Sequence, residues 1–252
     1  MRGERLDVSD RLDAVADAIS SLNNVVAAEE SLDVVLHQVA RNAVAAVADA
    51  DAVSITVLHD PPVRTVAHTD DDVLALDQQQ YLSRRGPCLE AAQYRRPVRV
   101  AMRTDRQRWP EFVTAARAAG VHATLSIPLI IASSAPGGQD ELVGSLNAYS
   151  RSTAAFDVVD EKVMGLYTSA ANQAIAEARR WQRLRETVGQ LEQALVSRAD
   201  IDQAKGVLRS LYGGTADDAF ALLVEQSQRE NVKLRDIAHR ILADLPRRGT
   251  RG

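Results

Sequence analysis

Cysteine and aromatic residues are scarce in this sequence, and both shortages limit what the protein can be. Cys88 is the single cysteine among 252 residues, which excludes an internal disulfide framework and any zinc site built from several cysteines. Aromatic residues account for only 4% of the chain, so we expect a core built from alanine, valine, leucine and isoleucine. The hydrophobic content of 46% is ordinary for a globular protein of one large or two small domains.

Long apolar segments are also absent. No stretch approaches the roughly 18 apolar residues that a membrane-spanning helix needs. Residues 1–13 are polar and acidic, unlike the apolar core of a signal peptide. Because a single cysteine also fits a reducing compartment, we predict a cytoplasmic protein with no membrane partner.

The motifs of common enzyme classes are missing as well. The sequence contains no glycine-rich phosphate loop, no HExxH motif and no Gly-x-Ser-x-Gly elbow. Its many acidic residues show no spacing typical of a catalytic pair. We therefore expect no enzymatic activity, no catalytic residue, no metal site and no cofactor.

Charge is close to balanced overall, at −4, but it is unevenly distributed. The residues from Arg179 to the end include 14 lysines and arginines and 10 acids, a net charge of +4, whereas the 178 residues before them carry −8. A basic C-terminal part on an acidic carrier is a pattern expected of proteins that bind the phosphate backbone of nucleic acids. A surplus of this size is also common on solvated helices.

Helical and strand patterns alternate in the first 150 residues. Few helical patterns separate adjacent strands, so we predict the α+β class, with a mostly antiparallel sheet and helices on its faces. Residues 70–96 are polar and irregular, and the aspartates at positions 70–77 are expected to be solvated. The expected elements are helices over 9–27, from 32 onward and over 110–119, and strands over 52–58, 64–68, 97–101, 123–131 and 142–149.

Several residues are expected to end these elements or to connect them. Ser9 and Ser31 are candidate caps of the first two helices, and Gly120 is expected to end the helix over 110–119. Pro61–Pro62 is expected to connect the first two strands, and Ser133–Asp140 to form a flexible turn.

A long helix is predicted from Asp157, which is preceded by Phe156 and followed by acids that favour a helix start. Its apolar residues recur at alternating steps of three and four, like a heptad seam that Glu177 interrupts. Over 163–175 this pattern fits equally well a helix packed on its own domain. Beyond Ala176 the surroundings are strongly charged, which favours a dimer stalk with a narrow seam formed by Trp181, Leu184, Val188, Leu191 and Leu195.

Three helical patterns end the sequence. The first includes Ile201, Ala204, Leu208 and Leu211 and ends at Gly213–Gly214. The second begins at a Thr215 cap, and the third follows Asn231 and closes at Pro246. The tail over 247–252 is expected to be disordered.

The segment Ser197–Leu242 closely resembles the ANTAR family, in several ordered pieces at the family's spacing. These pieces are Ser197–Arg198, Ile201–Gly206, Ala219–Phe220, Ser227–Gln228 and Asn231–Ala238. The resemblance implies a small three-helix domain that binds structured RNA and stabilises an antiterminator stem-loop pair, so that transcription reads through a terminator.

RNA loops present unstacked bases and phosphates, which cations, amides and hydroxyls on rigid helices can bind. Asn231 is also a candidate cap of the third helix. Gly206 is expected to permit close helix packing, and Phe220 and, less strongly, Tyr212 are expected in the core. The candidate RNA-binding residues are Arg198, Gln203, Lys205, Arg209, Ser227, Gln228, Asn231, Lys233 and Arg235.

The middle of the chain, from Leu32 to Ala178, resembles a GAF domain. The resemblance implies a central antiparallel sheet with helices on one side and a ligand cavity on the other. Such domains bind cyclic nucleotides, tetrapyrroles, haem or small metabolites, or serve only for dimerisation. The matching pieces are Gln80–Tyr81, Gly86–Ala91, Ser126–Leu129, Gly144–Ser150 and Phe156–Asp157.

Cys88 allows three interpretations. A covalent bilin site is disfavoured because Leu89 follows where phytochromes typically have histidine. A redox-sensing thiol is possible if Arg84 and Arg85 lower its pKa. The third and favoured interpretation is a small buried apolar residue. His68 and His122 are isolated and are expected at surface or strand-end positions rather than as haem ligands.

These observations lead to one hypothesis: a GAF–ANTAR transcription antitermination regulator of the actinobacterial type. Its partners are stem-loop RNA and a second copy of itself, and an unknown small molecule in the GAF cavity is a possible signal. The alternatives are a constitutive dimeric scaffold and a DNA-binding regulator, each with a non-sensing GAF fold. The expected parts are an N-terminal helix (1–30), the GAF-like domain (31–178), a helical stalk (179–196), the RNA-binding domain (197–246) and a tail (247–252).

Overall fold

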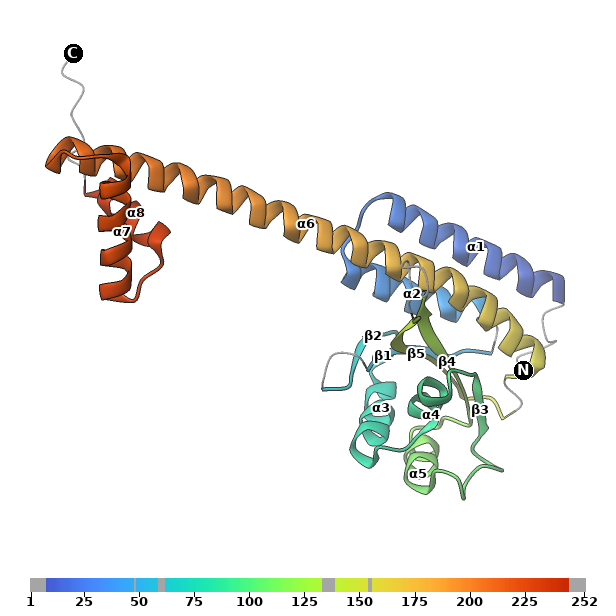
Figure 1. Ribbon diagram of the computed structural model, residues 1–252. Coiled ribbons are helices and arrows are strands. Elements are labelled where there is room, and N and C mark those ends of the chain that lie inside the picture. The colour runs from blue at the N-terminus through green and yellow to red at the C-terminus, as the bar shows by residue number, and fades with distance from the viewer. Residues whose placement is uncertain (1–7, 48, 59–61, 133–138, 154–155, 245–252) are drawn as a thin grey trace, which may run out of the picture. The chain divides into compact units, whose positions relative to one another are not determined.

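A five-stranded antiparallel sheet forms the centre of the first of two units. The computed structural model describes residues 8–47, 49–58, 62–132, 139–153 and 156–244, divided into Met1–Gln182 and Arg183–Gly252. The sheet has the order β2-β1-β5-β4-β3, and every neighbouring pair is antiparallel (Figure 1). Its strands are β1 (Ala52–Val57), β2 (Arg64–His68), β3 (Val98–Ala101), β4 (Ala123–Ile131) and β5 (Glu141–Ser150).

All five expected strands and the α+β class are therefore confirmed. The expectations for Pro61, for 133–138, for Pro246 and for the tail over 247–252 lie outside the described residues. No helix in the described part of the chain combines the length and apolar character that a membrane crossing requires.

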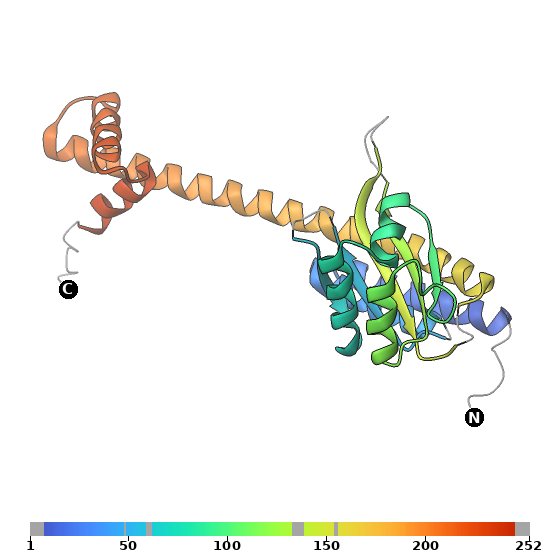
Figure 2. The same ribbon diagram turned by 90° about the horizontal axis from the view of Figure 1, so that it is seen from below.

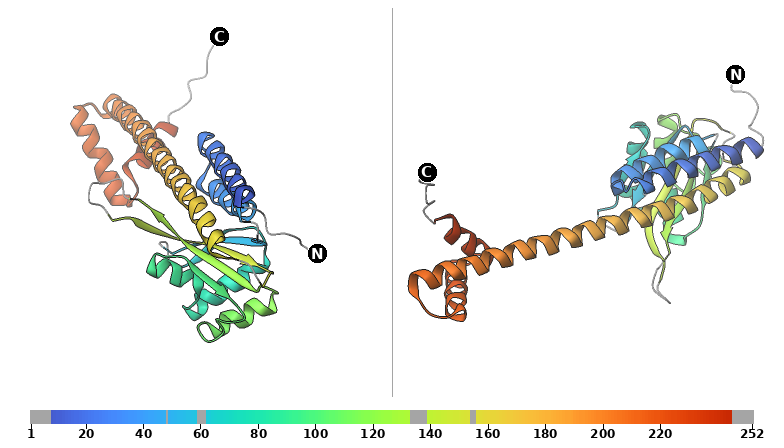
Figure 3. Two further views of the ribbon diagram at one scale, coloured as in Figure 1. Left: turned by 90° about the vertical axis from the view of Figure 1, so that its right-hand side faces the viewer. Right: turned by 90° about the horizontal axis from the view of Figure 1, so that it is seen from above.

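Helices cover both faces of the sheet. One face is covered by α2 (Leu32–Ala46) and the first turns of α6 (Val158–Tyr212), and α1 (Val8–Ala27) packs against α2 on the side away from the sheet, as the left panel of Figure 3 shows. The other face is covered by three shorter helices, which lie in front of the sheet in Figure 2. These are α3 (Asp72–Ser83), α4 (Pro87–Tyr94) and α5 (Pro110–Ala118).

The expectation that 70–96 is irregular is wrong, because α3 and α4 lie within it. Each of these helices ends on an arginine in the left-handed conformation, Arg84 at φ 52° and Arg95 at φ 50°. Glycine usually occupies such positions because it has no Cβ to clash. Without glycine, the sequence gives no stop signal for either helix.

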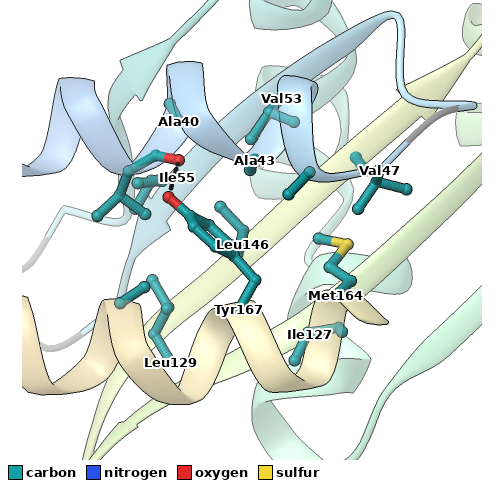
Figure 4. Close-up of a cluster of buried hydrophobic side chains, with 14 of the residues drawn as sticks. Ala40, Ala43, Val47, Val53, Ile55, Ile127, Leu129, Leu146, Met164 and Tyr167 are labelled. Atoms are coloured by element: carbon teal, nitrogen blue, oxygen red, sulfur yellow. Dashed lines mark hydrogen bonds between the residues drawn. The ribbon is translucent and has the colours of Figure 1, made fainter. Parts of the chain in front are cut away.

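The first turns of α6 belong to the core of the first unit. Val163, Met164, Tyr167 and Ile175 are buried there. Figure 4 shows the Tyr167 ring among aliphatic side chains of α2 and the sheet, with its hydroxyl donating to the Val39 carbonyl oxygen at 2.8 Å. Over 163–175, the interpretation of a helix packed on its own domain is therefore confirmed.

Helix starts are partly as expected. Ser31 caps α2 and accepts the Val34 N–H, whereas Ser9 lies inside α1, so the expected cap at Ser9 is wrong. Asp157 caps α6, as expected, because its Oδ1 accepts the N–H groups of Val159 at 2.7 Å and Asp160 at 2.9 Å.

A buried ion pair ties the start of α6 to α1. Arg11 is 5% exposed and donates to the Oδ1 atom of Asp160, which is 1% exposed, at 3.0 Å. The Asp157 carboxylate lies 3.6 Å from the same guanidinium nitrogen. Loss of the Arg11 guanidinium would remove the ion pair of the buried Asp160 carboxylate, and removing one partner of a buried ion pair is strongly destabilising.

The pairing of β1 with β5 requires glycine at position 144. A Cβ there would lie 1.7 Å from the Thr56 carbonyl oxygen, an atom of the paired strand. We predict that Gly144→Ala lowers the free energy of unfolding by about 2–3 kcal/mol or more, as expected when a packed site is overfilled. Chemical denaturation monitored by circular dichroism measures this change.

The matched control is Gly165→Ala in α6, where a Cβ would meet no atom within 4 Å. Alanine is a better helix former than glycine, so this variant should gain about 0.5–1 kcal/mol. Equal stabilities of the two variants would contradict the role assigned to Gly144.

Candidate nucleic-acid interface and sensor interior

The second unit contains a three-helix head with a small core. The last turns of α6 pack with α7 (Ala216–Glu230) and α8 (Leu234–Ala243). The expected three helices are confirmed, but the first of them is the end of α6 rather than a separate helix. Four buried residues form the centre of this core: Ala204, Leu223, Ile237 and Ala238.

Two tight corners hold the helices of the head. Gly213 and Gly214 have φ of 76° and 84°, which turns the chain after α6. Thr215 then starts α7 with a capping box: its hydroxyl accepts the Asp218 N–H, and Asp218 accepts the Thr215 N–H. The expected cap at Thr215 is confirmed.

The corner between α7 and α8 differs from the expectation. Asn231 adopts the left-handed conformation, at φ 52°, and ends α7, so the expectation that it caps the third helix is wrong. The N-cap position of α8 belongs to Lys233. Asparagine tolerates the left-handed region better than most residues, which accounts for its place here. The Ser227 hydroxyl closes the corner by donating to the Val232 carbonyl at 2.6 Å.

The candidate RNA-binding residues of α6 divide between two sides of the helix. Arg198, Lys205 and Arg209 follow at steps of seven and four and therefore form one stripe beside the buried Ala204. Gln203 is two residues from Lys205, about 160° around the helix, so it does not share this stripe. The Lys205 Nζ atom lies 2.9 Å from the Asp202 carboxylate.

The candidate residues near the corner between α7 and α8 differ in exposure and in hydrogen bonding. Gln228, Asn231 and Lys233 are exposed. The Ser227 hydroxyl is engaged in the corner. Arg235 is half-buried, and its Nε atom lies 3.5 Å from Asp236.

Two aromatic side chains that sequence analysis assigned to the core are exposed instead. Phe220 is 41% exposed and Tyr212 is 75% exposed, so both core assignments are wrong. The Lys205 Nζ atom lies 6.0 Å from the centroid of the Phe220 ring, the distance of a weak cation–π contact. Phe220 thus extends the stripe of Arg198, Lys205 and Arg209 onto α7.

Gly206 also differs from the expectation. A Cβ at this position would meet no atom within 4 Å. The expected close helix packing at Gly206 is therefore absent from the described part of the head.

The expected stalk seam is an exposed apolar row on α6. Trp181 is half-buried, and the four residues that continue the row are all exposed: Leu184, Val188, Leu191 and Leu195. Leucines repeated at this spacing on a charged helix are characteristic of a coiled-coil seam.

In the first unit, the sheet has one apolar and one polar face, and both are buried. Val53, Ile55 and Leu146 point toward α1, α2 and α6. The alternate residues point toward α3 and α4, where the GAF resemblance implies a ligand cavity. These buried polar residues are Ser54, Thr56, Thr124, Ser126, Ser145 and Asn147.

Asp77 of α3 lies over this polar face. The expectation that it is solvated is wrong, because it is fully buried. Its carboxyl group accepts hydrogen bonds from the Tyr149 hydroxyl and, at 2.7 Å, from the Thr65 hydroxyl. Burial raises the pKa of Asp77, and these two hydrogen bonds offset part of that rise.

Gln80 and Gly86, two positions of the GAF-like motif, lie against each other at the turn between α3 and α4. The Gln80 Oε1 atom accepts the Cys88 N–H at 3.0 Å and so caps α4 across the turn. A Cβ on Gly86 would lie 2.3 Å from that oxygen. Neither residue was predicted to have this structural role. The sequence signal that could have indicated it is a glycine directly before a proline that starts a helix.

Four buried polar atoms of this interior have no hydrogen-bond partner among the described residues. They are Gln80 Nε2, Thr124 Oγ1, Ser145 Oγ and Asn147 Oδ1. A buried polar group without a partner costs about 1–3 kcal/mol.

Cys88 is fully buried, and burial followed by the charge of Asp77 raises its pKa well above the ordinary value. This is the opposite of the shift that a redox-sensing thiolate requires. Arg84 and Arg85 are exposed on the turn before it. These facts support the buried apolar interpretation.

Two family models match the chain. The GAF domain model matches residues 29–176, and the ANTAR domain model matches residues 189–242. GAF domains are sensors and ANTAR domains bind RNA. The chain therefore belongs to the GAF domain family and, with its C-terminal ANTAR domain, is a GAF–ANTAR regulator.

Solved structures share the fold of the GAF region. A putative GAF sensor protein from Burkholderia vietnamiensis is 17% identical, with a TM-score of 0.51, and the match covers 67% of this chain and 98% of that one. The GAF domain of a phosphoenolpyruvate-protein phosphotransferase from Coxiella burnetii is 19% identical, with a TM-score of 0.50 and coverages of 69% and 98%. At these identities the likeness shows the fold alone. The comparison with curated proteins found no match.

Asp77 provides a test of the buried polar interior. Because its pKa is raised in the folded state, the folded protein binds the proton more tightly than the unfolded chain. This tighter proton binding by Asp77 stabilises the folded state at low pH. The stabilisation is lost as the pH rises from about 4 through the pKa of Asp77 in the folded protein. We predict that Asp77→Asn, which cannot ionise, gains stability relative to the native protein between pH 4 and pH 8, as measured by urea denaturation.

The control is Asp13→Asn on the exposed side of α1. Its stability relative to the native protein should show no comparable trend. A flat difference between Asp77→Asn and the native protein across this pH range would contradict the burial of an ionisable Asp77.

Proposed function

We propose that this protein is a cytoplasmic homodimer that promotes transcription antitermination by binding stem-loop RNA in response to a signal. The observation that carries the proposal is the stripe of Arg198, Lys205 and Arg209 on the ANTAR-matched head, with Phe220 beside it. Cations on one helix side suit RNA phosphates, and an exposed aromatic ring suits an unstacked loop base.

The proposed RNA surface has two parts. The first is the stripe on α6, extended by Phe220 of α7. The second is the corner between α7 and α8, where Gln228, Asn231 and Lys233 are exposed and Arg235 is half-buried. Amides and cations at such a corner can bind base edges and phosphates together. Gln203 and Ser227 remain candidates, with Gln203 on another side of α6 and Ser227 engaged in the corner.

The RNA-binding test compares a two-stem-loop RNA with duplex DNA of equal length by filter binding at fixed salt. We predict tighter binding to the RNA. Lys205→Ala and Arg235→Ala should each weaken it by about 1–3 kcal/mol, the range of a specific contact. An in vitro transcription assay across a terminator then measures whether the native protein increases read-through.

The matched control is Arg240→Ala, which removes an equal charge from α8 at an arginine paired with Glu230. Circular dichroism checks that each variant is folded. Stronger binding to duplex DNA than to the RNA would support a DNA-binding regulator. An equal loss of RNA affinity in all three variants would show that binding depends only on non-specific charge attraction.

The exposed row on α6 supports dimerisation through the stalk. A second copy would bury Leu184, Val188, Leu191 and Leu195, each worth about 1.5–3 kcal/mol when fully buried. We also propose the division into an N-terminal helix (1–30), a sensor domain (31–178), a stalk (179–196) that contains this row, and a head (197–246).

Sedimentation tests the stalk. We predict that Leu191→Lys weakens dimerisation tenfold or more, since about 1.4 kcal/mol corresponds to a factor of ten. The matched control is Gln190→Lys, one residue outside the row and also exposed, which should leave dimerisation unchanged. A monomeric native protein at micromolar concentration, or equal effects of the two variants, would contradict a stalk dimer.

The signal is proposed to act in the interior of the GAF domain. The four unpartnered polar atoms over the sheet support a small polar molecule as the occupant. Because a ligand shifts an equilibrium only by binding one state better than another, such a molecule would favour one arrangement of α6.

A further inference from the structure

A hollow of about 200 Å³ lies on the first unit, outside the buried polar interior. Its walls come from the turn between α3 and α4, from the outer side of α4 and from the end of the loop before α5. Cys88 and the four unpartnered atoms of the interior are not part of its lining. The residues that matter for its chemistry are Arg84, Arg85, Glu90, Tyr94, Arg108 and Trp109.

The hollow is strongly cationic within an otherwise acidic part of the chain. The segment from Arg84 to Arg108 contains eight arginines but only two acids, Glu90 and Asp105. The net charge of −8 over residues 1–178 hides this local surplus because acids elsewhere in that range outnumber the arginines.

One acid cannot neutralise the arginines of the hollow. Glu90 pairs with Arg108 and lies 3.7 Å from Arg96. Within the residues that the structure describes, neither Arg84 nor Arg85 has a carboxylate within 4.0 Å. The hollow therefore has an excess of positive charge that an anion would balance.

Two of the arginines that line the hollow are also held by contacts with uncharged groups, which do not neutralise them. The Arg85 side chain donates to the Arg108 carbonyl oxygen at 3.3 Å, which fixes its guanidinium across the hollow. The Arg108 guanidinium stacks 4.3 Å from the ring centroid of Trp109, which is buried. The turn itself is fixed by the contact between Gln80 and Gly86 described above.

We propose that this hollow binds a small molecule through a phosphate group. Guanidinium groups match the geometry of phosphate oxygens and bind them with paired hydrogen bonds. Three arginines around a hollow of this size suit a compact dianion such as a phosphate monoester. The acidic remainder of the unit would repel an extended polyanion, so an RNA strand fits this surface poorly.

The test uses the full chain and isothermal titration calorimetry at constant ionic strength, adjusted with sodium chloride. The probes are inorganic phosphate, inorganic pyrophosphate and ribose 5-phosphate. We expect saturable binding of at least one probe. Tighter binding of ribose 5-phosphate than of inorganic phosphate would identify a phosphate ester as the ligand class, and the reverse would identify a free phosphate.

The test variant is Arg84→Gly combined with Arg85→Gln. Glycine suits the left-handed conformation of position 84, so the charge is removed without strain. We expect this variant to bind at least tenfold more weakly, and the control Arg106→Gln, an exposed arginine that does not line the hollow, to bind within twofold of the native protein. Thermal melts check folding, and Arg84→Gly alone replaces the double variant if that variant unfolds.

Two results would overturn the proposal. One is the absence of saturable binding of all three probes to the native protein. The other is an equal loss of affinity in Arg106→Gln, which would show general attraction to a basic segment. Neither result depends on RNA binding by the head, so this proposal and the proposed function fail separately.

Discussion

One helix, α6, supplies core residues to both units, and the rest of the structure depends on this constraint. Tyr167 and Ile175 anchor its beginning under the sheet, and Ala204 anchors its end in the head. Between these anchors lies a polar helix whose apolar row is exposed. Isolated helices have little stability in water, and most helical stability in proteins comes from packing. The middle of α6 therefore depends on its anchored ends and, in the proposed dimer, on a second copy.

The two faces of the sheet in the first unit are both buried but differ in chemistry. The face toward α1, α2 and α6 is apolar and stabilises the fold through burial. The opposite face is lined by buried serine, threonine and asparagine. Three of these residues, Thr124, Ser145 and Asn147, have a buried side-chain atom without a hydrogen-bond partner among the described residues, and so does Gln80 of α3. Buried polar groups without partners reduce the stability of the folded state. Proteins commonly retain such destabilising features at functional sites.

Much of the fold was predictable because its signals are local. Alternating β-branched residues gave the strands, and capping residues such as Ser31, Asp157 and Thr215 gave the helix starts. Helices α3 and α4 were not predictable because each ends on an arginine in the left-handed conformation. Their turns were therefore mistaken for irregular chain.

The candidate site was predictable only in part, because exposure depends on tertiary packing. Nothing in the sequence distinguishes Asp77 from a solvated aspartate. It is buried because α3, the helix that contains it, packs over the polar face of the sheet. Phe220 follows the buried Ala219 by one residue, which rotates it about 100° around α7 and out of the core. The residues of the proposed RNA surface were selected by type, and type alone did not separate Gln203 from the side of α6 that holds Lys205.

The proposed signalling requires contacts between the GAF domain and α6 that a ligand can change, and the start of α6 has such contacts. Arg99 of β3 lies 2.8 Å from Glu161 and donates to the Phe156 carbonyl oxygen at 3.3 Å, so β3 is tied to the first turn of α6. Partly exposed ion pairs of this kind are worth about 0–1 kcal/mol, whereas allosteric coupling is typically 1–3 kcal/mol. A ligand can therefore rearrange these contacts without unfolding the apolar core around Tyr167.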